Sequence, residues 1–314
     1  MIEAQNLTMR YGSVTAVEDA SFTVRPREVV GLLGPNGAGK STIMKILTTY
    51  LWPTSGTAKI CGKDVLDEPT EVRKRIGYLP ESLPLYMDME VGRYLRFVGH
   101  ARGLDGGTLR ARMDWTVERC GIQEVYRRPI RELSKGFRQR TALAQALVHD
   151  PEVVILDEPT SGLDPHQIIE IRKLVRELAR EKTVIFSTHI LHEVEVVADR
   201  IVIISRGHII ADGTIDELRQ KAAKTQRLEI AVEAAREDVE QAFSGLLAAR
   251  RVTFLEQRNG TVWFHLETEP SQDTLHQIRE FMHEQGWKIQ QLRDVPLTLE
   301  ETFLALTEAE DSTA

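Results

Sequence analysis

The strongest chemical signal in this chain of 314 residues is a run of nine, Gly-Pro-Asn-Gly-Ala-Gly-Lys-Ser-Thr, at positions 34–42. An apolar stretch at 28–34 predicts a buried strand before it, and a helical pattern follows it. Glycines let backbone N–H groups approach a phosphate, and a helix N-terminus adds partial positive charge. In this pattern Lys40 reaches the terminal phosphates and the Ser41 hydroxyl can bind Mg²⁺. The residues predicted to contact phosphate are Gly34, Pro35, Asn36, Gly37, Ala38, Gly39, Lys40, Ser41 and Thr42.

Two adjacent carboxylates, Asp157 and Glu158, end a second apolar stretch at 151–158. Continuous apolar residues are typical of a parallel strand covered on both faces. Ligands of open α/β sheets bind beyond the carboxyl ends of the strands, so this pair should lie beside the phosphate loop (residues 34–42). One carboxylate can hold Mg²⁺ and the other can polarise an attacking water. The residues alone leave open which of the two carboxylates takes which role.

The elements that must position these groups follow from the apolar spacing. Ile43, Ile46, Leu47 and Leu51 predict a helix that starts in the phosphate loop and stops before Pro53. Ser134 can cap a second helix that runs to residue 148. Strands alternating with helices over the first 220 residues predict an α/β fold.

An ordered set of motifs resembles the ATP-binding subunits of ABC transporters. Leu-Ser-Lys-Gly-Phe-Arg-Gln-Arg at 133–140 resembles the ABC signature, Ser-Gly-Leu-Asp at 161–164 the D-loop, and Ser-Thr-His at 187–189 the switch-histidine loop. The resemblance covers roughly residues 3–220. It implies a P-loop NTPase (ABC ATPase) core at 1–220 with a helical signature subdomain at about 82–150, and hydrolysis of ATP with Mg²⁺.

The resemblance also implies roles for residues outside the phosphate loop. Asp157 would hold the metal, and Glu158, with Lys40 and His189, would act in catalysis. Tyr11 would stack on adenine, and His189 would hydrogen-bond the γ-phosphate and order water near Glu158. Ser134 and Gly136 would cover the ATP held by another subunit, a second copy of this chain or a paralogous ATPase subunit. Asp164, in the D-loop, joins the predicted nucleotide-binding set.

The sequence departs from the family pattern in two places. Lys135 and Phe137 replace the usual residues of the signature, and Lys135 could add charge near the nucleotide or point to solvent. Glu81 stands where the family usually has a glutamine that contacts Mg²⁺. A carboxylate is a hard oxygen ligand, so we keep Glu81 with Ser41 and Asp157 as a metal-site candidate.

Residues 76–86, the signature and residues 148–151 resemble a bacterial exporter subset that includes the gliding-motility type. That resemblance implies a separate polytopic membrane permease, docked where residues 80–104 form the helical surface. Leu83, Leu85, Tyr86, Met87 and Met89 supply apolar contacts there, although each could equally pack the subdomain. The chain has no apolar run of about 18 residues and no signal-peptide pattern at its start. We therefore expect it at the cytoplasmic face of the cell membrane, held there by the permease.

The last ninety residues have a different composition. From residue 225 onward there are 8 Lys+Arg and 17 Asp+Glu, whereas the whole chain has a net charge of −7. This acidic balance argues against a nucleic-acid partner, because phosphate binding needs positive charge. We place a domain boundary at 221–226. Strand and helix patterns in the order βαββαβ, with Asn-Gly at 259–260 as a hairpin turn, predict a C-terminal α+β ferredoxin-like domain at 225–308, with a final helix at 299–306 and a tail at 309–314.

Three functional hypotheses follow. The first is a transport ATPase whose two chains close on two ATP molecules and drive an exporter. The alternative is a soluble ABC ATPase that regulates a nucleoprotein complex, although such proteins usually carry two cassettes or a long insertion. The third, a non-catalytic binder, conflicts with the intact Lys40, Asp157, Glu158 and His189. The second domain would be regulatory, dimer-stabilising or partner-binding. Its histidines, His265, His276 and His283, are too scattered in the sequence to predict a metal site.

Overall fold

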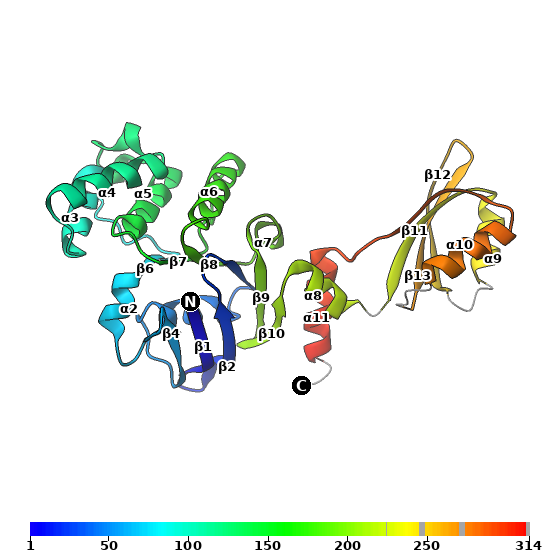
Figure 1. Ribbon diagram of the computed structural model, residues 1–314, viewed down its shortest axis with the longest axis horizontal. Coiled ribbons are helices and arrows are strands. Elements are labelled where there is room, and N and C mark those ends of the chain that lie inside the picture. Colours follow the sequence, from blue (N-terminus) through cyan, green and yellow to red (C-terminus); the bar gives the residue numbers. More distant parts are fainter. Residues whose placement is uncertain (224, 245–248, 270–273, 312–314) are drawn as a thin grey trace. The chain divides into compact units, whose positions relative to one another are not determined.

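The computed structural model describes residues 1–223, 225–244, 249–269 and 274–311. The chain divides into two compact units, Met1–Thr214 and Ile215–Ala314 (Figure 1). The division precedes the boundary expected at 221–226, because helix α8 (Ile215–Ala222) packs against helix α11 (Leu299–Asp311) of the second unit.

The first unit is built on a six-stranded sheet of order β10-β9-β3-β8-β7-β6. Neighbouring strands are parallel except for β10, which is antiparallel to β9. Every residue of β3 and β7 is buried, as expected for strands covered on both faces. The strands are β3 (Val29–Leu33), β6 (Ile76–Leu79), β7 (Val153–Asp157), β8 (Thr183–Thr188), β9 (Arg200–Ser205) and β10 (His208–Gly213).

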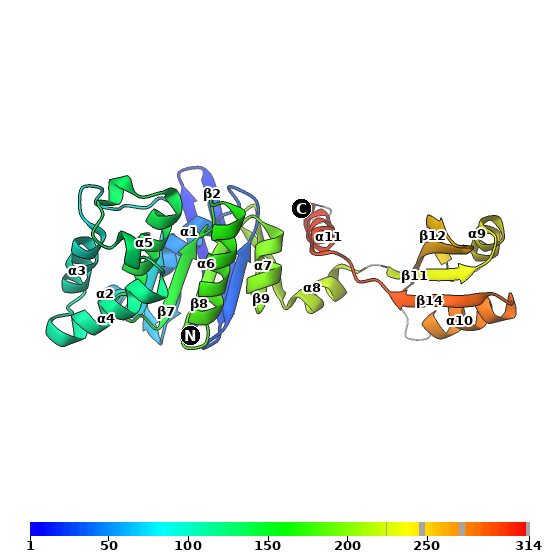
Figure 2. The same cartoon turned by 90° about the horizontal axis from the view of Figure 1, so that it is seen from above.

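A second, antiparallel sheet has the order β2-β1-β4-β5. Helix α1 (Lys40–Leu47) contacts strands of both sheets and fills the space between them (Figure 2). Its Ile43, Ile46 and Leu47 are fully buried in the core that the two sheets share. The strands are β1 (Ile2–Tyr11), β2 (Val14–Val24), β4 (Ser55–Ile60) and β5 (Lys63–Asp64).

Helix α1 is shorter than the apolar spacing predicts. It ends at Leu47, so Leu51 lies outside it. Thr49 adopts a left-handed conformation with φ 60°, and its N–H donates to Ile46 O, which closes the helix end. A β-branched residue in this region costs backbone energy, and the chain turns here toward β4.

The segment between β6 and β7 is largely helical, and single helices also precede β6, follow β7 and follow β8 (Figure 1). Helix α5 begins at the predicted cap, Ser134, whose Oγ accepts from Phe137 N at 3.3 Å. The helices are α2 (Pro69–Arg75), α3 (Val91–Ala101), α4 (Gly106–Arg119), α5 (Lys135–Leu147), α6 (Pro165–Leu178) and α7 (Leu191–Val197), with short 3-10 turns at Gln123–Val125 and Ile130–Glu132.

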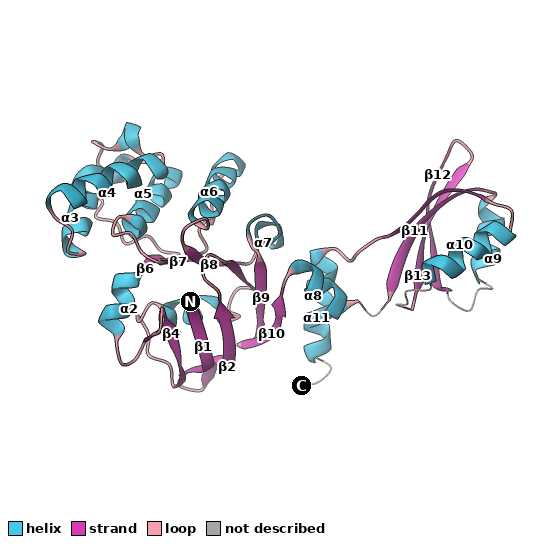
Figure 3. Cartoon of the chain, viewed as in Figure 1, coloured by secondary structure: helices cyan, strands magenta, loops and turns pink. Residues whose placement is uncertain are grey.

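The second unit contains a four-stranded antiparallel sheet of order β12-β13-β11-β14 (Figure 3). Alternate residues of β13 are buried against two helices, and Phe243, Phe264, Ile278 and Met282 form part of this core. The element order is the predicted βαββαβ, with β11 (Gln226–Glu233), α9 (Arg236–Ser244), β12 (Ala249–Arg258), β13 (Thr261–Thr268), α10 (Thr274–Glu284) and β14 (Lys288–Asp294).

The turn between β12 and β13 is the one that its sequence predicts. Asn259 and Gly260 have φ values of 50° and 80°, which is the pair of positive angles that a type I′ turn requires. Across the described ranges, no helix combines the length and the apolar character needed to span a bilayer.

Both cysteine thiols should react slowly with alkylating reagents in the native protein. Burial raises the pKa of the Cys61 thiol to about 11 and that of the Cys120 thiol to about 12. Because the thiolate is the nucleophile, about one Cys61 thiol in a thousand is reactive at pH 8. We expect iodoacetamide to label the native protein at least about a hundredfold more slowly than free cysteine, and guanidinium-unfolded protein at the normal rate; mass spectrometry of timed samples measures both. Rapid labelling of the native protein would contradict the raised pKa values of the half-buried Cys61 and the buried Cys120.

Candidate functional site

The phosphate loop connects β3 to α1 and depends on its glycines. Gly39 has φ 110°, and a Cβ at this position would lie 2.5 Å from Ala16 O, so no other residue fits without moving the backbone. Ala38 N donates to Pro35 O at 3.2 Å and tightens the turn. The first turn of α1 carries no acidic residue. The positive end of the helix dipole is therefore available to an anion at the loop.

Lys40 is a buried cation at the start of α1, with 5% of its surface exposed. Its Nζ donates to the backbone oxygens of Gly34, at 2.7 Å, and Pro35, at 3.0 Å. The same nitrogen lies 3.7 Å from Glu158 Oε1. These contacts hold the ammonium at the loop, where it can exchange a carbonyl for a phosphate oxygen.

The carboxylate pair ends β7, and a serine of the neighbouring strand orders it. Asp157 Oδ1 accepts from Ser41 Oγ at 3.1 Å and from Ser187 Oγ at 2.6 Å. Ser187 Oγ in turn accepts from Glu158 N at 3.0 Å. The loop serine and the last strand residues therefore form one buried hydrogen-bond chain. Sequence reasoning quoted Ser187 only as part of a motif and did not assign it to the site.

Glu158 and His189 face each other across the ends of β7 and β8. His189 Nδ1 lies 3.1 Å from Glu158 Oε1 and 3.0 Å from Oε2. Glu158 has φ 49°, in the left-handed region that costs a non-glycine residue about 1 kcal/mol. This backbone turn brings its carboxylate to both His189 and Lys40. Glu158 is 7% exposed, so the carboxylate acts in a largely water-free setting.

Of these converging groups, Lys40, Ser41 and Glu158 line a cavity of about 340 Å³ at the phosphate loop, whereas Asp157 and His189 are not among its lining residues. Glu81, in the segment after β6, faces the same cavity as Ser41. Its lining residues are Ala16, Asn36, Gly37, Gly39, Lys40, Ser41, Thr42, Glu81 and Glu158.

These oxygen donors fit a magnesium ion held partly by substrate. Ser41, Asp157 and Glu81 offer a hydroxyl and carboxylates, which are hard ligands. In the part of the chain that the structure describes, no three His, Cys, Asp or Glu side chains form a metal-binding cluster. Mg²⁺ usually keeps several waters and takes one or two carboxylates plus phosphate oxygens, so a full protein cage is not needed. Burial, and then the charge of Asp157, raises the pKa of the neighbouring Tyr78 well above its usual value, which keeps that phenol neutral.

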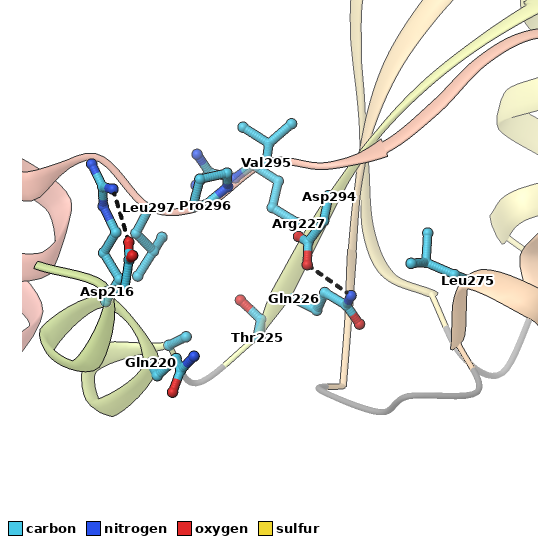
Figure 4. A pocket seen from close by; sticks show the side chains of 12 residues that line it. Asp216, Gln220, Thr225, Gln226, Arg227, Leu275, Asp294, Val295, Pro296 and Leu297 are labelled. Atoms are coloured by element: carbon cyan, nitrogen blue, oxygen red, sulfur yellow. Dashed lines mark hydrogen bonds and ion pairs between the residues drawn. The ribbon is translucent and has the colours of Figure 1, made fainter.

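A larger cavity, of about 890 Å³, lies in the second unit (Figure 4). Residues of α8, β11 and the segment after β14 line it, and Gln226 Nε2 donates to Asp294 Oδ2 at 3.1 Å. None of its lining residues belongs to the phosphate loop or to the carboxylate pair. We place the chemistry in the smaller cavity, because the phosphate-loop residues and Glu158 line that cavity and not the larger one.

Four other predicted residues lie outside the phosphate cavity. Ser134 caps α5, and Asp164 caps α6 by accepting from Gln167 N at 2.9 Å. Gly136 packs so closely on Gln167 that a Cβ would lie 2.5 Å from its side chain. Tyr11 ends β1 and is 46% exposed. None of the four is among the residues that line the cavity with Lys40.

Lys135 is an exposed residue of the signature that also approaches another motif. Its side chain lies over the D-loop, because a Cβ at Gly162 would be 1.8 Å from Lys135 Nζ. The end of the lysine side chain therefore lies directly against the backbone of Gly162. Sequence reasoning missed this contact, since the two residues are 27 positions apart.

Comparison with known proteins agrees with this geometry. The family model for ABC transporters matches residues 17–161. The uncharacterized ABC transporter ATP-binding protein YxlF of Bacillus subtilis is 41% identical over 221 residues, which are 70% of this chain and 73% of that protein. This chain belongs to the ABC transporter ATP-binding proteins. The predicted family and its P-loop NTPase core are confirmed, and the chain is an ATPase.

One further relative and one solved structure are also similar to this chain. The bacitracin transport ATP-binding protein BcrA of Enterococcus faecalis is 30% identical to this chain, and the alignment covers 98% of this chain and 96% of BcrA. The dimeric structure of MJ0796, a bacterial ABC transporter cassette, is 25% identical with a TM-score of 0.64, and covers 68% of this chain and 99% of that one. The similarity to BcrA thus spans both units of the chain.

Replacing Lys40 tests the phosphate loop. Because a hydrogen bond to a charged group contributes about 1.5–3 kcal/mol, we expect Lys40→Ala to weaken ATP binding by about 10- to 100-fold. Titration with a fluorescent ATP analogue measures the affinity. Lys45→Ala, at the other end of α1, is the matched control and should bind normally. Equal affinities for the two variants would remove Lys40 from the site.

Proposed function

We propose that this ATPase energises an exporter: two chains close on two Mg·ATP, and the closure drives a separate polytopic permease. The second chain is another copy or a paralogous ATPase subunit. The transport direction draws on the resemblance of residues 76–86, the signature and residues 148–151 to an exporter subset, and the similarity to BcrA adds a relative that is named for bacitracin transport. The protein would lie at the cytoplasmic face of the cell membrane, bound there through the permease.

The observation that carries the proposal is the division of the nucleotide-binding residues into two sets. Lys40, Ser41 and Glu158 line one cavity, whereas Ser134 and Gly136 form a helix N-terminus outside it. The N-terminus of α5 has free N–H groups and no acidic residue in its first turn, so it suits a γ-phosphate. If that phosphate belongs to another chain, two partial sites become two complete ones. The dimeric ABC cassette to which this chain is similar supports the arrangement.

Cleavage of ATP would then rest on positioning and charge. Lys40 and the loop N–H groups bind the β- and γ-phosphates and offset their negative charge. Glu158 holds the attacking water through its carboxylate, and His189 donates to the γ-phosphate. Mg²⁺, held by Ser41 and Asp157 with Glu81 nearby, supplies further charge neutralisation when bound. Tyr11 offers an aromatic face to adenine.

The helical region offers a surface to the permease. Of the five apolar residues singled out from sequence, Tyr86 and Met87 are exposed, whereas Leu85 is buried. The rings of Tyr86 and Phe97 are tilted by 55° with their centroids 5.6 Å apart, and Phe97 is itself 47% exposed. An exposed aromatic cluster next to the segment that carries Glu81 could couple the site to the membrane partner.

Replacing Glu158 tests the catalytic role. Loss of general-base help typically lowers the rate by about 10² to 10⁴, so we expect Glu158→Gln to retain ATP binding, lose turnover and accumulate as an ATP-bound dimer. Phosphate release and size-exclusion chromatography with ATP measure the two effects. Glu118→Gln, at an exposed position of α4, controls for charge and should behave normally. Steady turnover by Glu158→Gln would reject this assignment.

Replacing Glu81 tests the metal site. We expect Glu81→Ala to raise the Mg²⁺ concentration for half-maximal hydrolysis by about tenfold, while metal-free ATP binding stays unchanged. The measurement is phosphate release over a Mg²⁺ titration, with Glu132→Ala, at an exposed position before α5, as the control. An unaltered Mg²⁺ profile would exclude Glu81 as a ligand.

A further inference from the structure

A buried carboxylate outside the nucleotide cavity links the two catalytic loops. Glu193 lies in the first turn of α7 and is 2% exposed. Its Oε2 accepts from Thr188 Oγ1 at 2.6 Å, and its Oε1 accepts from Thr160 Oγ1. Both threonines are themselves buried. Each carboxylate oxygen therefore holds a different hydroxyl.

The two hydroxyls belong to the segments that carry Glu158 and His189. Thr160 lies two residues after Glu158, and Thr188 directly precedes His189. Thr188 Oγ1 also accepts from Ile190 N at 3.0 Å, so the backbone on the far side of His189 is held through the same group. The carboxylate thus bridges the chain just beyond β7 and the chain at the end of β8.

A purely structural role explains this arrangement poorly. A buried carboxylate pays a large desolvation penalty unless it is paired with a cation or fully hydrogen-bonded. Across the described residues, no ion pair involves Glu193, and its side chain accepts from the two threonine hydroxyls alone. An apolar side chain of the same size would avoid that penalty but would leave both buried threonine hydroxyls without this acceptor. What only the carboxylate supplies is two fixed acceptors that set the distance between two hydroxyls.

We propose that Glu193 is a positioning residue for ATP cleavage, which keeps Glu158 and His189 at their contact distance through Thr160 and Thr188. The inference rests on the proposed roles of Glu158 and His189. The Glu158–His189 contact joins the ends of two different strands, and Ser187 on β8 also accepts from Glu158 N. A shift of about 1 Å in such a geometry can cost about 10² in rate.

The test compares Glu193→Ala and Glu193→Gln in the full-length protein. We expect the alanine variant to lose at least about tenfold in kcat, with the KM for ATP within about twofold of normal, because the cavity that binds ATP is untouched. The glutamine variant should recover at least about half of the lost activity, since an amide can accept from one threonine and donate to the oxygen of the other. Glu195→Gln, on the same helix but outside the bridge, is the control and should leave kcat unchanged.

Thr160→Val and Thr188→Val give a second test that does not depend on the folding of Glu193→Ala. Each should lower kcat, and the double variant should lose little more than the worse single one, because both hydroxyls act through one carboxylate. Normal kcat in these variants, additive losses, or an effect confined to KM would overturn the inference. Glu158→Gln, assayed in parallel, separates the two proposals: if it loses turnover while the Glu193 and threonine variants do not, only the positioning role fails.

Discussion

The pairing of β7 with β8 is the constraint on which the site depends. Their parallel register sets Asp157 opposite Ser187, and the two strands end at the same edge of the sheet. A single hydroxyl, Ser187 Oγ, then donates to Asp157 and accepts from Glu158 N. Since Asp157 also accepts from Ser41, the strand pair fixes where the phosphate loop meets the carboxylates.

Charge burial follows from this arrangement. Lys40, Asp157 and Glu158 are each less than a tenth exposed, and isolated charges would be costly there. They are tolerated because each is hydrogen-bonded or lies near a group of opposite charge. The same low-dielectric setting strengthens the attraction of the Lys40 ammonium for a phosphate, so burial raises both the cost of these charges and their electrostatic effect on a bound nucleotide.

Much of the first unit could be read from local patterns, and the exceptions have identifiable causes. The phosphate loop, the strand before it and the cap at Ser134 depend on neighbours in sequence, and they lie where expected. Helix α1 ends early because of the left-handed turn at Thr49, which no apolar spacing reveals. The second unit begins at Ile215, before the boundary predicted at 221–226, because α8 packs against α11, which lies far from it in the sequence.

The sequence by itself determined the chemistry: glycines that admit phosphate, a lysine to bind it, adjacent carboxylates, and the motif order that marks an ABC ATPase. These features are local, so residue type and spacing suffice to predict them. Only the tertiary structure decided which groups meet. The Ser187 bridge, the Lys135 contact with the D-loop and the buried Glu193 all join segments that are separated in the chain, and such contacts depend on sheet register and packing, which a linear pattern does not encode.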